Sequence, residues 1–212
     1  MKLTKTSTLW YAHDPMCSYC YAFSPVFAQL EETLSFSGTQ VKYLLGGLAP
    51  DSNQAMDSTT IAHVKAAWLT ISEEYGTEFN FDYWDKNTPR RSTYNACRAV
   101  LVAKEHNLEK EMIHGIQQAY YLQAKNPSNI NILADIAESI GIDVSDFTGK
   151  LLSPEINQQL RYNIEQARVF SMYTFPSLVL VCEKGASKIT IDYKNADNMA
   201  SMIENILLTD SD

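Results

Sequence analysis

Two cysteines three residues apart, Cys17 and Cys20, are the residues of this chain best suited to chemistry. We expect both thiols in the first turn of a helix, close enough to be joined by a disulfide. The unpaired N–H groups and partial positive charge of a helix N-terminus stabilise a thiolate, which is the attacking species in disulfide exchange. The pair therefore predicts a redox site in which Cys17 is the nucleophile and Cys20 is the resolving thiol.

Two structural alternatives exist for these thiols. Both cysteines could be inert packing residues, because free cysteine is often buried. A zinc site would need a second close pair of Cys or His ligands, and neither Cys97 nor Cys182 has a His within four residues. We therefore predict no metal site, and we assign Cys97 and Cys182 to packing within apolar segments.

The segments around the cysteine pair indicate a βαβ unit. Residues 8–12 form an apolar run typical of a strand, residues 21–34 have the apolar periodicity of a helix, and residues 39–45 form a second β-rich run that ends at Gly46-Gly47. This order places the cysteines at the carboxyl end of the first strand, where open α/β sheets have their sites.

From about residue 49 the pattern becomes helical. Helices are expected at residues 59–75, 92–106, 109–125, 131–140, 143–152 and 154–170. An aromatic loop at 80–90 follows the first of them, and we interpret its aromatic residues with Trp68 as the core of the block rather than an apolar lid over a cleft. Strands are expected again at 177–182 and 188–193, joined by a loop at 183–187, and a helix at 196–208 closes the chain.

Four stretches together resemble the DsbA family of thiol–disulfide oxidoreductases, and in particular its FrnE-like branch of dithiol–disulfide isomerases. They are residues 14–23 (DPMCSYCYAF), 45–50 (LGGLAP), 93–100 (TYNACRAV) and 174–180 (TFPSLVL). The resemblance spans nearly the whole chain. It implies an α/β, thioredoxin-like fold with an inserted helical domain: residues 1–48 and 171–212 in the thioredoxin-like domain and residues 49–170 in the insert.

The resemblance also implies a role for Pro176, because in thioredoxin-fold enzymes the proline before the third strand is cis and lies against the cysteine pair. A cis peptide there leaves the preceding backbone free to pair with an extended substrate, whereas a trans proline that begins a strand is the alternative. The residues predicted to bind substrate are Ser18, Tyr19, Thr174, Phe175 and Pro176, and those predicted to support the site are His13, Asp14 and Pro15. His13 could tune Cys17 or shuttle a proton, or it could be a strand-end residue hydrogen-bonded to the backbone.

This sequence departs from the family pattern at two points. The dipeptide Ser18-Tyr19 lacks the His that many periplasmic oxidants place before the second cysteine, and Asp14 adds negative charge nearby. We therefore expect a less oxidising pair than in those oxidants, as suits a reductase or isomerase. Thr174 stands where relatives commonly have Gly, so we expect a reshaped loop before Pro176.

The composition limits partners and location. A net charge of −8 and a pI near 5.0 disfavour a general nucleic-acid binder and docking to anionic lipid. No run approaches the roughly 18 apolar residues of a membrane span, and residues 1–7 lack the apolar core of a secretory signal. We expect a cytoplasmic protein with no bound cofactor, acting on protein or small-thiol disulfides, with glutathione as a candidate redox partner. The sequence does not indicate an oligomeric state.

Two other functions fit the same fold. Kappa-class glutathione transferases and hydroxychromene-carboxylate isomerases share it, but they use glutathione with a Ser or a single Cys at the active position, so the presence of Cys17 and Cys20 favours the oxidoreductase. A non-enzymatic chaperone or adaptor would instead tolerate replacement of both cysteines by Ser. Arg90, Arg91 and Arg98 could meet an anionic ligand such as glutathione, although we favour a solvated or salt-bridged role.

Overall fold

A single mixed sheet forms the frame of the protein. The computed structural model describes residues 7–208. Its strands are β1 (Thr8–His13), β2 (Gln40–Leu45), β3 (Ser177–Cys182) and β4 (Gly185–Ile189), in the spatial order β2-β1-β3-β4. β1 is parallel to β2 and antiparallel to β3, and β3 is antiparallel to β4. The predicted α/β, thioredoxin-like fold is therefore confirmed.

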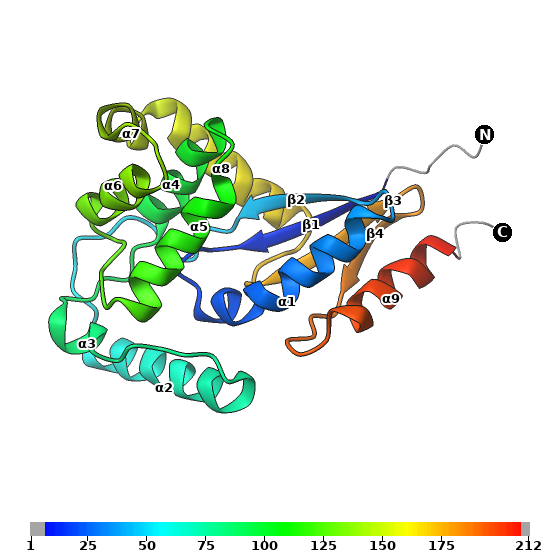
Figure 1. Ribbon diagram of the computed structural model, residues 1–212, viewed down its shortest axis with the longest axis horizontal. Helices are drawn as coiled ribbons and strands as arrows, with labels where there is room; N and C mark the ends of the chain where they lie inside the picture. The colour runs from blue at the N-terminus through cyan, green and yellow to red at the C-terminus, as the bar shows by residue number, and fades with distance from the viewer. Residues whose placement is uncertain (1–6, 209–212) are drawn as a thin grey trace.

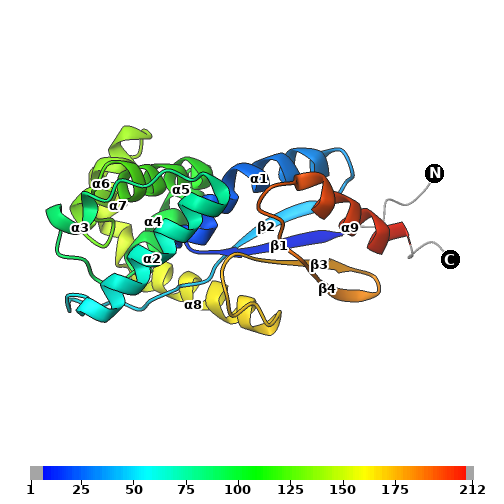
Figure 2. The same cartoon turned by 90° about the horizontal axis from the view of Figure 1, so that it is seen from below.

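Helices cover both faces of this sheet because side chains alternate along each strand. Leu9 and Tyr11 pack with apolar residues of α1 (Ser18–Ser35) and α9 (Ala196–Leu208). Ala12 and its neighbours on the other face pack against the end of α8 (Pro154–Val169). Figure 2 shows α1 and α9 on one side of the sheet and α8 on the other.

The remaining helices come from the part of the chain that follows β2 and precedes β3, and they form a block at the left of Figure 1. They are α2 (Ser58–Tyr75), α3 (Tyr83–Lys86), α4 (Tyr94–Glu105), α5 (Glu109–Gln117), η1 (Gln118–Leu122), α6 (Ile130–Ser139) and α7 (Val144–Leu151). Helix α4 is central, because every residue from Ala96 to Ala103 is buried. Trp68 is fully buried and stacks on Phe79 at 4.9 Å, so the aromatic cluster is core, as predicted.

The bounds of the inserted domain remain a prediction. Helix α8 falls inside the predicted insert at 49–170, yet it contributes Ala167 to the core on the sheet and also packs against α4. One helix therefore belongs to both parts of the structure.

Two predicted elements were wrong in extent. The helix expected at 109–125 becomes π-helical after Gln117 and ends at Leu122, because Asn80 donates to the carbonyls of Tyr121 (2.7 Å) and Leu122 (3.0 Å). The strand expected at 188–193 is instead β4, Gly185–Ile189, since Cys182 pairs with Gly185 across a turn of residues 183–184. The chain then turns at Asp192, whose carboxylate accepts the N–H groups of residues 194 and 195.

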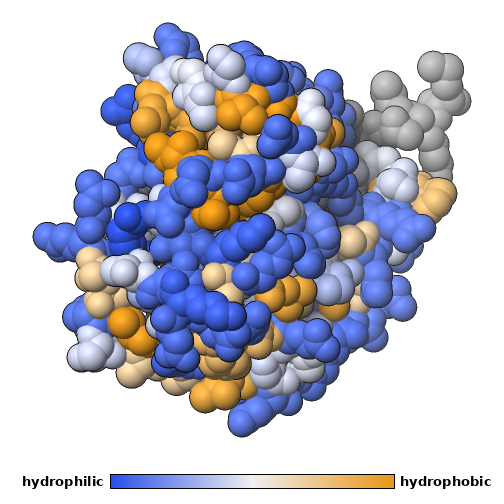
Figure 3. Space-filling model, turned by 60° about the vertical axis from the view of Figure 1, so that its left-hand side comes forward, coloured by the Kyte–Doolittle hydropathy of each residue, from blue (hydrophilic) through white to orange (hydrophobic). Residues whose placement is uncertain are grey.

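The surface of the helical end is mostly hydrophilic, with apolar residues gathered in small patches (Figure 3). Within residues 7–208, no helix is both long enough and apolar enough to cross a membrane.

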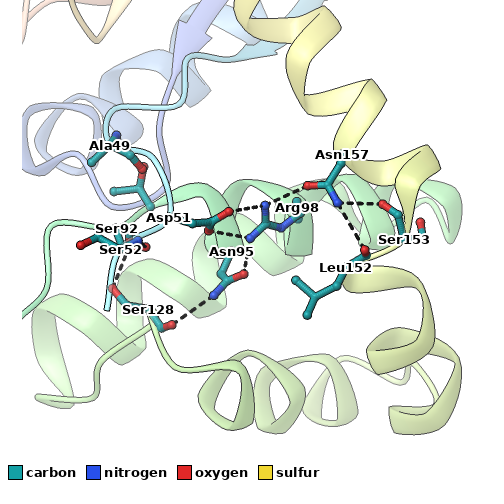
Figure 4. Close-up of polar contacts among 11 residues, drawn as sticks. Ala49, Asp51, Ser52, Ser92, Asn95, Arg98, Ser128, Leu152, Ser153 and Asn157 are labelled. Carbon is teal, nitrogen blue, oxygen red and sulfur yellow. Dashed lines mark hydrogen bonds and ion pairs between the residues drawn. The ribbon is translucent and has the colours of Figure 1, made fainter. Parts of the chain in front are cut away.

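Arg98 ties the loop after β2 to helices α4 and α8 (Figure 4). Its side chain is 3% exposed, and its two terminal nitrogens donate to the Asp51 carboxylate at 2.9 and 2.7 Å. The same guanidinium donates to Asn157 of α8 at 3.0 Å and to Asn95 within α4. Arg98 therefore has the salt-bridged role that the sequence favoured.

Replacing Arg98 with Met is expected to lower the free energy of unfolding by about 2 kcal/mol, because the partly buried acceptors Asn95 of α4 and Asn157 of α8 lose a charged donor. The half-exposed Asp51 can be hydrated and limits the loss. Urea unfolding at pH 7 measures the change. The matched control is Lys86→Met, whose ion pair with Asp82 is exposed on both sides, so a change below about 0.5 kcal/mol is expected. Equal losses of unfolding free energy in Arg98→Met and Lys86→Met would contradict this stabilising role of Arg98.

Candidate active site

Cys17 lies at the N-terminus of α1 as the capping residue. Its backbone is extended, with φ −85° and ψ 118°, and its sulfur accepts the N–H of Cys20 at 3.4 Å. A turn precedes it, in which the N–H of Cys17 donates to the carbonyl of Asp14 at 3.0 Å with Pro15 inside the turn. Both cysteines are free thiols, Cys17 7% exposed and Cys20 fully buried. Of the two cysteines, only Cys17 has any exposed surface.

The loop before β3 lies against this sulfur. The Phe175–Pro176 peptide is cis, as the resemblance implied, and the thiol of Cys17 donates to the carbonyl of Phe175 at 3.4 Å. The Phe175 ring rests on Gly46 so closely that a Cβ there would lie 2.1 Å from it. Gly46 is therefore needed for the close approach of this loop. Thr174 is exposed, and its carbonyl accepts the Ser177 hydroxyl at 2.6 Å.

Asp14 is fully buried beneath the turn and binds four donors. One carboxylate oxygen accepts the N–H of Met16 at 2.9 Å. The other accepts the N–H of Leu48 at 2.7 Å, the hydroxyl of Thr93 at 2.6 Å and the thiol of Cys97 at 3.4 Å. Burial raises the pKa of Asp14, and the hydrogen bonds oppose that rise. This carboxylate joins the cysteine turn to the loop after β2 and to the start of α4.

Cys97 is thus more than the packing residue that the sequence indicated. It is fully buried, as predicted, but it also donates to Asp14. Thr93 and Cys97 are four residues apart at the start of α4, a spacing that puts both on one helix face. Cys182 is half-buried at the end of β3.

The environment of Cys20 differs from that of Cys17. Burial raises the pKa of Cys20 well above its ordinary value, and the adjacent Cys17 raises it further. Cys20 therefore remains a protonated thiol at neutral pH. This state suits a resolving thiol, which acts only after the outer sulfur has reacted.

Cys17 opens on a pocket of about 240 Å³. Ser18, Tyr19 and Phe175, three of the predicted substrate-binding residues, line it, while Thr174 and Pro176 do not. The opposite wall comes from α2 and from the loop before α4, and it carries the basic side chains His63, Arg90 and Arg91. Arg91 and His63 are exposed, and Arg90 donates to Asn129. The pocket thus pairs a sulfur with a cationic wall.

His13 is not part of this pocket, although the sequence suggested it as a supporting residue. It is 1% exposed, its ring stacks on Tyr11 at 4.9 Å, and its Nε2 has no hydrogen-bond partner among the described residues. Burial lowers the pKa of His13 to about 3. The imidazole is therefore neutral at physiological pH, and it lies on the α1 face of the sheet.

The pKa of His13 predicts acid sensitivity. Between its ordinary value of 6.5 and its folded value of about 3, the unfolded chain binds a proton that the native chain does not. The free energy of unfolding therefore falls as pH falls, by up to about 1.4 kcal/mol per pH unit from this residue. Urea unfolding between pH 7.5 and 4.5 should show a shallower fall in His13→Phe than in wild type. The exposed His63, changed to Gln, is the control, and an unchanged slope in His13→Phe would contradict the assignment.

Among residues 7–208, no group of three or more His, Cys, Asp or Glu side chains is arranged to hold a metal ion.

Comparison with known proteins agrees with this architecture. A family model for the DSBA-like thioredoxin domain matches residues 10–204. The protein YwbO of Bacillus subtilis is 25% identical over 170 residues, which cover 76% of this chain and 82% of YwbO. The ClpXP adapter protein SpxH of Bacillus subtilis is 25% identical over 169 residues, which cover 78% of this chain but only 55% of SpxH.

Two solved structures share the fold over almost their whole length. A candidate protein disulfide isomerase from Nitrosomonas europaea has a TM-score of 0.82 and 26% identity, with 97% of this chain and 99% of that one covered. The cytosolic disulfide reductase DsbM from Pseudomonas aeruginosa, solved with glutathione, has a TM-score of 0.75 and 22% identity, with 95% and 99% covered.

Proposed function

Because the chain belongs to the family of DSBA-like thioredoxin domains, we propose that it is a thiol–disulfide oxidoreductase whose reactive pair is Cys17 and Cys20. The observation that carries this proposal is the asymmetry of the pair. The sulfur of Cys17 caps α1 beside the N–H of Cys20 and opens on a pocket, while Cys20 is fully buried behind it. A nucleophile and a resolving thiol require that difference.

In the reducing direction, the Cys17 thiolate attacks one sulfur of a substrate disulfide and releases the other as a thiolate. Cys20 then loses its proton and attacks Cys17, which releases the second substrate thiolate and leaves the Cys17–Cys20 disulfide. Two electrons pass from enzyme to substrate. The reverse sequence oxidises two substrate thiols. The N–H of Cys20 stabilises the Cys17 thiolate in both directions.

The reduction potential of the pair tests this proposal. The protein is equilibrated in glutathione buffers, and its free thiols are counted by mass spectrometry. We expect a reversible two-electron couple. Its reduction potential should lie between about −270 mV, the value of thioredoxin, and about −120 mV, the value of DsbA. A protein with no Cys17–Cys20 disulfide in any buffer, or with one formed by Cys97 or Cys182 instead, would overturn the mechanism.

Glutathione is the small-thiol partner that we propose. It is an anionic tripeptide, and the pocket around Cys17 has a cationic wall that includes the exposed Arg91. The likeness in fold to a reductase solved with glutathione supports the idea. A bound glutathione would place its thiol at Cys17 and its carboxylates near the cationic wall.

Replacing Arg91 with Gln is expected to slow reduction of the oxidised enzyme by glutathione about fivefold, because one exposed charge contact is worth about 1 kcal/mol. Stopped-flow tryptophan fluorescence measures the rate. Reduction by dithiothreitol, which carries no charge, should be unchanged. Arg161→Gln, an exposed arginine outside this pocket, is the matched control. An equal loss with both reductants would show that Arg91 acts on the cysteines and not on glutathione.

A binding module for protein partners is the second candidate, because curated relatives at 23% and 25% identity are ClpXP adapter proteins. The chain spans just over half the length of these proteins, so adapter activity is a proposal only. Such a module would keep its activity with both cysteines changed to Ser. We also propose a cytoplasmic location, as the composition suggested, and membership of the FrnE-like branch stays a prediction.

A further inference from the structure

We infer that a pocket of about 510 Å³ between the sheet, α1 and α5 is a second small-molecule site, which binds an uncharged planar aromatic compound carrying hydrogen-bonding groups. It shares no lining residue with the pocket at Cys17. Figure 1 shows α1 and α5 in front of β1 and β2, the four elements that supply most of the lining. Its volume lies in the range of about 300–1,000 Å³ that small-molecule sites occupy.

The walls favour a flat apolar ring. Tyr11 and Tyr43 from adjacent strands and Phe27 from α1 all line the pocket. The Tyr11 and Phe27 rings are 4.0 Å apart, and the Tyr43 ring meets both of them edge-on. Aromatic rings arranged in this way offer faces and edges on which another ring can pack.

Two buried polar side chains point to hydrogen bonds with the compound. His13 lines the pocket at 1% exposure, and its Nε2 has no partner. Gln117 of α5 also lines it, at 4% exposure. Buried polar groups in folded proteins are nearly always paired. A ligand that brings a donor and an acceptor would satisfy both side chains.

The charges around the pocket disfavour an anionic ligand. Glu31 accepts both the Tyr43 hydroxyl at 3.1 Å and the Lys110 ammonium at 2.6 Å. The lysine is therefore already paired with a carboxylate. His13 is neutral, because burial lowers its pKa to about 3. An uncharged phenol or amide fits this balance better than a carboxylate or phosphate.

Titration with 4-hydroxybenzamide, which has a phenol and a primary amide on one ring, tests the site. Amide chemical shifts of the ¹⁵N-labelled full chain should change saturably around α1 and α5, with a Kd of about 1 mM or tighter. Gln117→Leu should weaken binding at least fivefold. Cys17→Ser should bind as wild type does, so that failure of this site and failure of the redox proposal are separable.

A surface substitution that fills the pocket tests binding without changing a residue of the protein core. Ala28 is exposed on α1 and lines the pocket, so Ala28→Trp should fill the space and abolish saturable binding. Its neighbour Gln29 is equally exposed but lies outside the lining, so Gln29→Trp should bind normally. Shift changes centred on the Cys17 pocket, no saturable shifts, or equal affinity in the two tryptophan variants would overturn the inference.

Discussion

Cys17→Ser is expected to lose thiol–disulfide exchange activity by at least about 10³-fold, because removal of a covalent nucleophile removes the reacting atom itself. A serine hydroxyl is not ionised at neutral pH and cannot form the mixed disulfide. The assay is reduction of a mixed disulfide of glutathione and a fluorescent peptide, followed by release of the fluorophore. No neighbouring thiol is expected to substitute, since Cys20 is fully buried and its pKa is raised.

The complementary variant Cys20→Ser separates the two roles. Cys17 keeps its position and pocket, so it still attacks the substrate disulfide, but the mixed disulfide is no longer resolved. Mass spectrometry should therefore detect one glutathione bound to Cys20→Ser and none bound to Cys17→Ser.

Cys182→Ser is the matched control for both variants, because this thiol is half-buried at the end of β3. Its activity should equal that of the wild type. Retention of full biological activity by a variant with both Cys17 and Cys20 changed to Ser would exclude the oxidoreductase and favour the binding module.

The arrangement of the cysteine pair could be predicted because its signals are local. An apolar run ending just before Asp14 marks a strand, and the periodic segment after Cys20 marks a helix. The family resemblance implied that a cis Pro176 lies against the cysteine pair, whereas the contact of the Phe175 carbonyl with Cys17 comes from the structure. Gly46 is a physical sign of this close approach, since no side chain fits beneath the Phe175 ring.

Asp14 was predicted as a supporting residue, but its partners could not be predicted, because its contacts join distant parts of the chain. Asp14 meets Leu48, Thr93 and Cys97, which are 34, 79 and 83 residues away. A single aspartate before a cysteine carries no sign of such partners. A supporting role for His13 stays a prediction, and strand alternation turns its ring away from the Cys17 pocket, toward α1.

Tertiary contacts also explain the two wrong element bounds. The helix expected to run to residue 125 ends at Leu122, where Asn80 binds the carbonyls of Tyr121 and Leu122 and where Ala124 adopts a left-handed backbone with φ 53°. The alternating residues 188–193 suit a strand, but β4 begins earlier, where Gly185 pairs with Cys182 of β3. The pairing with β3 ends at Ile189, which lies opposite Leu178. Periodicity identifies an element, whereas its ends depend on which backbone groups a distant residue binds.

Asp14→Ala is expected to lower the free energy of unfolding by about 3–5 kcal/mol. It leaves the N–H groups of Met16 and Leu48 without an acceptor, and the Thr93 hydroxyl keeps only the carbonyl of Ala49 at 3.3 Å. Each unpaired buried group costs about 1–3 kcal/mol. Urea unfolding at pH 7 measures the loss. Asp82→Ala, an exposed aspartate, should cost below about 1 kcal/mol.

The same change should also separate positioning from chemistry. Asp14 holds the turn that ends at Cys17, and it does so through bonds to the loop after β2 and to α4. Loosening the turn should therefore slow exchange at Cys17 in the fraction that remains folded, whereas Asp14→Asn, which keeps one oxygen acceptor, should recover part of both stability and rate. If Asp14→Ala were destabilised but exchanged disulfides at the wild-type rate when folded, the carboxylate would serve the core alone, and the geometry of Cys17 would depend on the helix cap and on the carbonyl of Phe175.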